Sequence, residues 1–407
     1  MKLFLLLTGL VSAHAWASSI YNITDLGTLG GNSSMAYALN DAGQAAGTAT
    51  NPFGNMNAMN FGGALSLSAG ASESSAWGVN NANQISGTQY INGVAYATVW
   101  NNGAPELLAG ANSYGTGINQ SGDAAGMLVS RGQGEAFVMI NGIVQVLGSP
   151  DGCFWSSAYS INGADQAAGY AQTWGGMRAF VWSPDSGYLT LGTLGGANSY
   201  AMAINDSGEV AGHAQTSSGY LHAALWNGSS IQDLGTLDGG NSYAYGIDAA
   251  GDVVGASGDH AFLYQDGVML DLNSLLTAGP GWTLTQAYAI NASGQIAGAG
   301  LFNGVEHAFL LNPTEPQPPP TASSLFFASP EYSVTTPEPS SWTLILAGLA
   351  LGLVPFRAAM RKHAAVQSSP VPRHYMLTRS RLLTPHHPRA TMEVSHETSE
   401  LHHHPGT

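Results

Sequence analysis

One position in a repeated phrase holds residues that could do chemistry. In the last three copies it is His222, His260 and His307, which open the phrases HAALW, HAFLY and HAFLL. Neutral imidazole is a common metal ligand, so three histidines in one sector of a fold could bind a metal ion or another ligand. Earlier copies carry different residue types, namely Asn57, Tyr96, Glu135 and Arg178. This variation favours a second interpretation, a polar strand residue that bonds a neighbouring turn.

Carboxylates in two turns are the second candidates. The turns NDSGE and IDAAGD carry Asp206, Glu209, Asp248 and Asp252. Calcium takes several oxygen ligands, and two carboxylates per turn are too few to enclose it. A glycosidase needs a specific pair of carboxylates, and the sequence singles out no such pair. We therefore predict no catalytic residues and no cofactor, with calcium left open as a possible ion.

Aromatic residues point to binding. Many of them lie in hairpins or just before them, namely Tyr114, Phe154, Trp155, Tyr159, Trp174, Tyr200, Tyr243 and Tyr288. Aromatic faces beside polar groups grip sugars by apolar contact and oriented hydrogen bonds, although we expect most of these rings to pack inside the fold. Phe154 and Trp155 stand out because SPDGCFWSS replaces a glycine-rich unit there. We predict that this pair is exposed and binds a ligand.

Charge and cysteine content exclude some classes of protein. Only Arg131 and Arg178 are basic between residues 16 and 336, against 21 acidic residues. Binding to phosphate backbones needs lysine and arginine, so nucleic acid is excluded as a partner. Cys153 is the single cysteine among 407 residues, so packing rather than a disulfide framework must stabilise the fold.

A phrase like YAMAINDSGEVAG recurs seven times. Its last glycine falls at Gly47, Gly87, Gly126, Gly169, Gly212, Gly255 and Gly298. The spacing is about 40 residues, which is typical of propellers and solenoids. The first polar residue of each turn is Asn, or Asp248 in the sixth copy, and can close an Asx-type turn. Three residues later comes Gly, Asn or Asp, which tolerate a positive φ. The last glycine indicates a bulge or a close approach between sheets.

Each repeat contains four short segments with strand character, which predicts one propeller blade per repeat. The last repeat reaches HAFLLN and then meets a proline-rich stretch, so it lacks its fourth strand. The N-terminal IYNITDLG can supply that strand and remove an open sheet edge. We predict an all-β, seven-bladed β-propeller of four-stranded blades over residues 18–312, closed by the N-terminal strand. An open solenoid is the alternative.

The two ends of the chain indicate export. Residues 1–17 resemble a signal peptide, with Lys2, an apolar run and cleavage after Ala15 or Ala17. Residues 313–336 form a Pro/Ser/Thr-rich linker. An apolar stretch follows at 342–356, which predicts a short C-terminal hydrophobic helix. Basic residues come directly after it, namely Arg357, Arg361 and Lys362.

Residues 337–362 resemble a PEP-CTERM sorting signal. The motif Pro337-Glu338-Pro339, the apolar stretch and the basic cluster occur in the order that this signal requires. The resemblance implies an exosortase-type processing enzyme as partner and transient membrane anchoring through the helix. It also implies delivery to the outer envelope or extracellular matrix. The tail at 363–407, with His402-His403-His404, extends past the usual end of such signals. It is a disordered or read-through piece, or else a metal-binding tail.

The repeats themselves resemble the extracellular HAF repeat family. The HAF tripeptides and the unit DLGTLGG…A-x-x-I-N-x-x-G-x-x-x-G carry this resemblance, which covers about Ile20 to Asn312. It implies a secreted protein without assigning any chemistry. We expect a non-catalytic binding or structural module associated with an exopolysaccharide or a surface protein. The alternatives are an extracellular polysaccharide hydrolase or lyase, and a purely architectural matrix protein.

Overall fold

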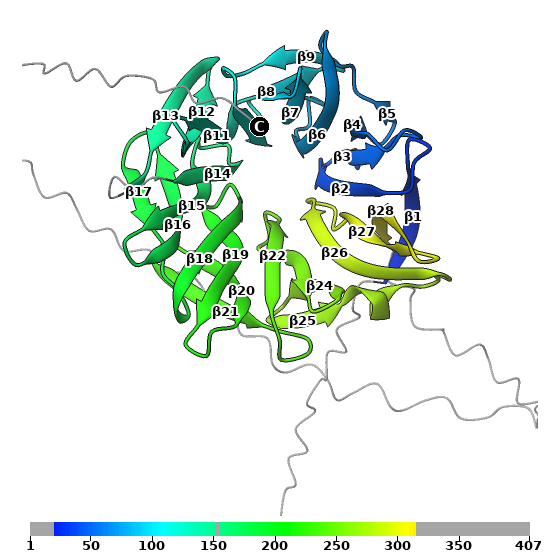
Figure 1. Ribbon diagram of the computed structural model, residues 1–407. Helices are drawn as coiled ribbons and strands as arrows, with labels where there is room; N and C mark the ends of the chain where they lie inside the picture. The colour runs from blue at the N-terminus through cyan, green and yellow to red at the C-terminus, as the bar shows by residue number, and fades with distance from the viewer. Residues whose placement is uncertain (1–19, 151–154, 315–407) are drawn as a thin grey trace, which may run out of the picture. The chain divides into compact units, whose positions relative to one another are not determined.

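Seven four-stranded antiparallel sheets surround a central channel in the computed structural model, which describes residues 20–150 and 155–314 (Figure 1). The prediction of an all-β, seven-bladed propeller is therefore confirmed. The proposed signal peptide, the sorting signal with its hydrophobic helix, and the histidine-rich tail lie outside the described residues. Within the described ranges, no helix is long and apolar enough to cross a membrane.

The blades follow the chain in order, and each is named here by its number from 1 to 7. The innermost strands, which face the channel, are β2 (Ser34–Leu39), β6 (Ala71–Val79), β10 (Ser113–Ile118), β14 (Ser156–Ile161), β18 (Gly195–Ile204), β22 (Ser242–Ile247) and β26 (Trp282–Ile290). The second strands are β3 (Ala45–Thr50), β7 (Ile85–Ile91), β11 (Ala124–Ser130), β15 (Ala167–Thr173), β19 (Glu209–Thr216), β23 (Val253–Ser257) and β27 (Ile296–Phe302).

The third strands are β4 (Met56–Asn60), β8 (Val94–Asn101), β12 (Gln133–Ile140), β16 (Gly176–Ser183), β20 (Leu221–Asn227), β24 (His260–Gln265) and β28 (Val305–Pro313). The outer strands are β5 (Gly63–Ala64), β9 (Ala104–Leu107), β13 (Ile143–Gly148), β17 (Gly187–Thr190), β21 (Ser230–Gly235), β25 (Val268–Asp271) and, in blade 7, β1 (Tyr21–Gly27). A 3-10 helix, η2 (Leu272–Leu275), follows β25.

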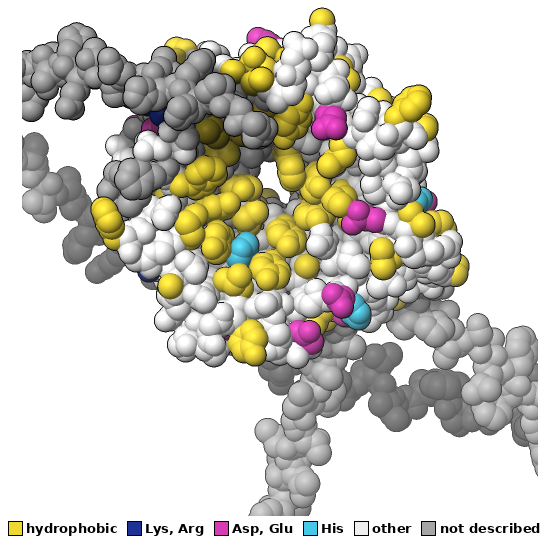
Figure 2. All heavy atoms as spheres, in the orientation of Figure 1, with side chains coloured by type: hydrophobic (Ala, Val, Ile, Leu, Met, Phe, Trp, Pro, Cys, Tyr) yellow, Lys and Arg dark blue, Asp and Glu magenta, His cyan; other side chains and the backbone are white. Residues whose placement is uncertain are grey.

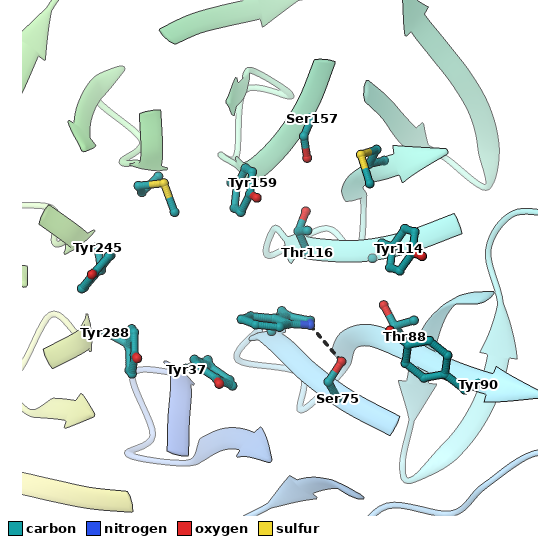
Figure 3. A pocket seen from close by; sticks show the side chains of 14 residues that line it. Tyr37, Ser75, Thr88, Tyr90, Tyr114, Thr116, Ser157, Tyr159, Tyr245 and Tyr288 are labelled. Atoms are coloured by element: carbon teal, nitrogen blue, oxygen red, sulfur yellow. Dashed lines mark hydrogen bonds between the residues drawn. The ribbon is translucent and has the colours of Figure 1, made fainter. Parts of the chain in front are cut away.

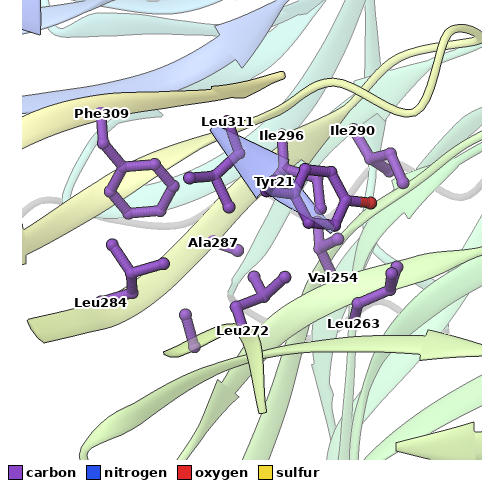
Figure 4. Packing of buried hydrophobic residues seen from close by; sticks show 11 residues of the cluster. Tyr21, Val254, Leu263, Leu272, Leu284, Ala287, Ile290, Ile296, Phe309 and Leu311 are labelled. Atoms are coloured by element: carbon purple, nitrogen blue, oxygen red, sulfur yellow. The ribbon is translucent and has the colours of Figure 1, made fainter. Parts of the chain in front are cut away.

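Blade 7 takes its outer strand from the other end of the propeller sequence. Strand β1 pairs antiparallel with β28, from Tyr21 opposite Pro313 to Gly27 opposite Ala308. The Tyr21 side chain is 2% exposed and packs in a cluster with Ile296 and Leu311 (Figure 4). The first and last strands of the propeller thus share one sheet, which leaves no unfilled outer position in blade 7.

The hydrophobic core lies between adjacent blades. Between blades 1 and 2, for example, the small residues Ala38, Ala46 and Ala58 pack with Ile85 and Trp100, which is fully buried. Small side chains on one sheet face leave the room that a large ring on the next blade fills, as close packing requires. Each blade therefore needs its neighbours, and the closed ring supplies two to every blade.

The repeated turn has the predicted conformation in all seven blades. In blade 5 the Asn205 Oδ1 accepts hydrogen bonds from the backbone N–H groups of Ser207, at 3.1 Å, and Glu209, at 2.9 Å. The residue three positions after the first polar residue has a positive φ in every copy, at Gly43, Asn83, Gly122, Asp165, Gly208, Gly251 and Gly294. The sequence pattern thus predicted this backbone correctly.

The last glycine of each phrase sits opposite a β-bulge in the innermost strand of its own blade. In blade 5 the bulge falls between Ala201 and Ala203, where Ala201 pairs with Gly212. A Cβ on Gly212 would lie 2.0 Å from the Tyr200 carbonyl oxygen, so no side chain fits. Of the two interpretations drawn from the sequence, the bulge is therefore correct.

Candidate ligand pocket at one mouth of the channel

The three histidines of the HAF phrases lie in separate blades, and each pairs with one aspartate of its own sheet. His222 Nδ1 is 2.9 Å from Asp233, and His260 Nδ1 is 2.8 Å from Asp271. His307 pairs in the same way with Asp25 of β1, at 3.0 Å. Each pair joins a third strand to an outer strand. The structure thus does not bring the histidines together, and the described residues contain no group of three metal-ligating side chains.

The acidic turn residues bond their own surroundings. Asp206 accepts a hydrogen bond from the Gly163 N–H of blade 4, at 2.8 Å. Asp248 Oδ1 accepts from two backbone N–H groups of its turn. Asp252 accepts from Gln265, and Glu209 accepts from Asn205. These contacts give the carboxylates a role in shaping turns.

A cavity of about 380 Å³ lies at the end of the channel away from the repeated turns, and Figure 2 shows hydrophobic side chains gathered around this hollow. Its walls come from innermost strands and from two second strands. The main contribution is one inward position, three residues before the first polar residue of each turn. This position holds Tyr37, Trp77, Thr116, Tyr159, Met202, Tyr245 and Tyr288.

Nine aromatic rings contact one another in series around most of this mouth. The series runs through Trp77, Tyr37, Tyr288, Tyr245, Tyr243, His213, Tyr200, Tyr170 and Tyr159. The closest pair is Trp77 and Tyr37, which are stacked with ring centroids 4.3 Å apart and an angle of 25° between their planes. Blades 4 and 5 place rings on both their first and second strands, and blade 6 places two rings on its first strand, so aromatic side chains fill that side of the mouth.

The cavity exists because blades 2 to 4 place smaller side chains at several of the corresponding positions. Ser75, Thr88, Thr116 and Ser157 contribute hydroxyl groups to its wall. Figure 3 shows Thr88 among Ser75, Tyr90 and Tyr114, with Tyr37 and Tyr288 on the other side of the cavity. The site therefore combines an aromatic wall with a wall of hydroxyl groups.

The pocket is uncharged at neutral pH. None of the described residues that line it is acidic or basic. Burial raises the pKa of Tyr245 to about 12 and also raises the pKa values of Tyr37 and Tyr288, because the phenolate is poorly solvated there. These phenols remain neutral hydrogen-bonding groups. The arrangement can bind a neutral ligand by ring contacts and hydrogen bonds.

Thr88 is the one pocket residue with a buried hydroxyl that lacks a hydrogen-bond partner among the described residues. The residue is 2% exposed. A buried polar group without a partner lowers stability, and such groups occur where a ligand or a water molecule completes the contact. A turn of the Thr88 side chain toward the cavity would let a ligand hydroxyl supply the missing hydrogen bond.

Aliphatic side chains line the channel below the pocket, where a hollow of about 190 Å³ continues it. The residue directly before each turn's first polar residue is Leu39, Val79, Ile118, Ile161, Ile204, Ile247 or Ile290. The turns themselves surround a separate hollow of about 270 Å³ at the opposite mouth. The two mouths thus differ in chemistry: one is aromatic, and the other presents amides, carboxylates and backbone groups.

The sequence singled out some of these pocket residues and missed others. Tyr114, Tyr159 and Tyr288 line the pocket, while Tyr200 and Tyr243 belong to the aromatic series. Trp174 is 89% exposed at a hairpin. Trp155 is partly buried, where a Cβ on Gly134 would meet its ring, and Phe154 lies outside the described residues. The missed residues include Tyr37, Trp77, Thr88 and Tyr245; three of them share the inward repeat position, which alignment of the repeats could have revealed.

No family model matches the sequence, and no curated protein matches it either. Among solved structures, TolB from Acinetobacter baumannii is 13% identical with a TM-score of 0.40, over 66% of this chain and 63% of that chain. A gluconolactonase from Xanthomonas campestris is 12% identical with a TM-score of 0.37, over 57% of this chain and 83% of that one. An acylaminoacyl peptidase from Pyrococcus horikoshii is 11% identical with a TM-score of 0.38, over 61% and 46%. At these scores the likenesses carry no argument about function.

Proposed function

We propose that this protein is an exported, non-catalytic binding module whose aromatic channel mouth holds a neutral carbohydrate, as part of an exopolysaccharide or cell-surface matrix. The observation that carries the proposal is the composition of the pocket, in which aromatic faces stand opposite hydroxyl groups without any charged side chain. Sugars offer C–H faces that pack on rings and hydroxyl groups that need oriented hydrogen bonds. This pocket supplies both.

Binding is favoured over catalysis at this site. Cleavage of a glycosidic bond by the common mechanisms uses two carboxyl groups that flank the bond. The described residues of the pocket include no carboxyl group. Burial raises the pKa values of the Tyr245 and Tyr288 phenols, which makes these two groups poor general bases at neutral pH.

The proposed location rests on the two ends of the chain. The N-terminal apolar run supports export, and Pro337-Glu338-Pro339 with Arg357, Arg361 and Lys362 supports sorting by an exosortase-type enzyme. The hydrophobic stretch between them would anchor the chain in the membrane until it is processed. The propeller would then be released to the outer envelope or the matrix.

Titration of the purified protein with a panel of neutral and acidic polysaccharides, with and without calcium, tests the proposal. Tryptophan fluorescence would report binding, and a reducing-end assay would report cleavage. Saturable binding of a neutral polysaccharide without new reducing ends supports a binding module. Release of shorter sugars would place the protein among the enzymes, and absence of binding to every polysaccharide would favour a purely architectural role.

A further inference from the structure

We propose that the pocket binds the chain end of a neutral glycan, with its terminal sugar ring against Trp77 and a sugar hydroxyl bonded to Thr88. This inference rests on the proposed function and specifies which part of the polysaccharide enters. It follows from three features of the site, which are the closed wall, the exposed face of Trp77 and the unpartnered hydroxyl of Thr88.

The wall of the pocket is closed all around, which favours entry end-on. The innermost strands of all seven blades contribute residues to its lining, with Met202 from blade 5, so the ring of blades surrounds the cavity. Below the cavity the channel continues into a smaller hollow of about 190 Å³, which side chains such as Leu39 and Ile290 line. Because the blades surround the channel, the interior of a polymer could enter the cavity only as a folded-back loop. A chain end can enter the cavity directly, without folding back on itself.

Trp77 provides the platform for a sugar ring. Its side chain is 42% exposed although it belongs to an innermost strand, so part of the indole faces the cavity. One side of the ring stacks on Tyr37, and its Nε1 donates a hydrogen bond to Ser75 Oγ at 2.9 Å. These two contacts fix the indole in place before any ligand arrives. A fixed ring loses little conformational freedom on binding, which favours affinity.

Thr88 supplies a polar anchor close to that platform. Its Oγ1 is buried without a partner among the described residues, and Figure 3 shows the residue near Ser75, which itself bonds Trp77. A hydroxyl can both donate and accept, so it suits a sugar hydroxyl of either orientation. A ligand without hydrogen-bonding groups would leave this hydroxyl unsatisfied, which disfavours a purely apolar ligand.

The lack of charge selects against acidic glycans. A uronic acid in the pocket would lose its hydration and find no cationic partner among the lining residues. The propeller also carries far more acidic than basic residues, which repels anionic polymers. We therefore expect a preference for neutral over acidic chains.

The test compares chains with different numbers of ends. The full-length protein is titrated with dextran, mannan and a neutral β-glucan, and with partial acid hydrolysates of each at equal mass. For any polymer that binds, the hydrolysate should bind more strongly per unit mass, in proportion to its added chain ends. Equal strength per unit mass would overturn end-on binding while leaving the proposed function intact. Alginate should bind at least tenfold more weakly, and equal binding of alginate would overturn the preference for neutral chains.

Variants assign the site. Trp77→Ala should weaken binding at least tenfold, whereas Trp174→Ala, at an exposed hairpin tryptophan, should leave it unchanged. Thr88→Val should weaken binding about fivefold, and Thr88→Ser, which keeps the hydroxyl, should restore it. Thr88→Val removes an unpartnered group, so its melting temperature should not fall and misfolding cannot explain the loss. Wild-type affinity in Thr88→Val would remove Thr88 from the site, and wild-type affinity in Trp77→Ala would overturn the assignment. Absence of binding to every glycan by the wild type would instead reject the proposed function.

Discussion

The Asn291 side-chain amide donates a hydrogen bond of 2.9 Å to the backbone carbonyl oxygen of Asn40, 251 residues away in the sequence. This contact joins blade 7 to blade 1. The same bond links blades 1 to 2, 2 to 3, 3 to 4, 4 to 5 and 5 to 6, at 3.0–3.1 Å, through Asn40, Asn80, Asn119, Asn162 and Asn205. The turn asparagine therefore both shapes its own turn and ties its blade to the next one.

Blade 6 is the exception, because Asp248 occupies the asparagine position. Its Oδ1 accepts from the backbone N–H groups of Ala250 and Asp252, as the asparagines do in their turns. Its other oxygen therefore takes the place where the asparagines carry their amide donor. Burial raises the pKa of Asp248 above its usual value of 3.8, and burial likewise raises that of Asp252. Protonation gives Asp248 a donor, whereas ionisation removes it.

Asp248→Asn should increase the free energy of unfolding at pH 7 by about 1 kcal/mol, the worth of one added hydrogen bond. A carboxyl group whose pKa is raised in the folded state contributes to the free energy of unfolding through its protonated form. This contribution is fully present below the unfolded-state pKa and is lost as pH rises through the folded-state pKa. The advantage of the variant should therefore shrink as pH falls toward 4. Urea unfolding at both pH values measures this.

Asn162→Asp is the matched control for that prediction. It places a carboxyl group at the same position in blade 4, where the amide now donates to the Asn205 carbonyl oxygen at 3.0 Å. This variant should lose stability at pH 7. If Asp248→Asn is instead less stable than the wild type at pH 7, the ionised carboxyl group of Asp248 makes a favourable interaction, which would contradict the prediction.

Strand β1 should be essential for the stability of blade 7. Deletion of residues 20–26 removes the outer strand of that sheet and should lower the melting temperature strongly. Tyr21→Ala should cost about 3 kcal/mol, because it empties a buried aromatic position, whereas Thr24→Ala on the exposed face should cost much less. Thermal unfolding followed by circular dichroism measures all three. An unchanged melting temperature after the deletion would contradict closure by β1.

The turn of blade 5 tests the conformational role of its glycine. Gly208 has a φ of +80°, which a β-branched residue adopts only with strain. Gly208→Val should cost about 2 kcal/mol, while Ser207→Val at the neighbouring exposed position should have a small effect. Chemical unfolding of the two variants gives the comparison. Equal losses would show that the left-handed conformation is not the source of the effect.

His213 should make the folded protein sensitive to acid. It lies between the rings of Tyr200 and Tyr243, and burial lowers its pKa from 6.5 to about 4. A base with a depressed pKa contributes stability above its unfolded pKa, and this is lost as pH falls through the folded pKa. The loss between pH 7 and pH 4 should be on the order of 2 kcal/mol.

His213→Phe keeps a ring between the two tyrosines and removes both the titrating group and the unpartnered Nδ1. The variant should lose less stability than the wild type over the same pH range. Because the other histidines are unchanged, the difference between the two proteins isolates His213. Identical pH profiles would mean that His213 is protonated without cost in the fold.

Much of the fold could be predicted from the sequence because the repeated residues determine the local conformation of each turn. The asparagine, the left-handed residue three positions later and the bulge glycine each fix a backbone conformation, and their spacing set the blade number. The contact from Asn291 to Asn40 could not be predicted, because it depends on how two blades meet in space. The three HAF histidines share one register position on separate blades, and this does not bring their side chains together.

The pocket was harder to predict because its shape depends on the positions of small side chains. Thr88 and Thr116 look unremarkable in the sequence, yet they leave the space that aromatic rings fill elsewhere around the mouth. The large residues at the inward position, such as Tyr37 and Trp77, were visible in the repeats. Their common direction could be interpreted only from the closed ring, in which the seven innermost strands face one channel.

Binding of a neutral polysaccharide to the full-length protein, followed by isothermal titration calorimetry in the wild type and in Trp77→Ala, tests the central claim most directly. We predict saturable binding by the wild type, no new reducing ends, and at least tenfold weaker binding by the variant. Absence of saturable binding to any neutral polysaccharide, or binding that Trp77→Ala leaves unchanged, would contradict a carbohydrate site at the aromatic mouth of the channel.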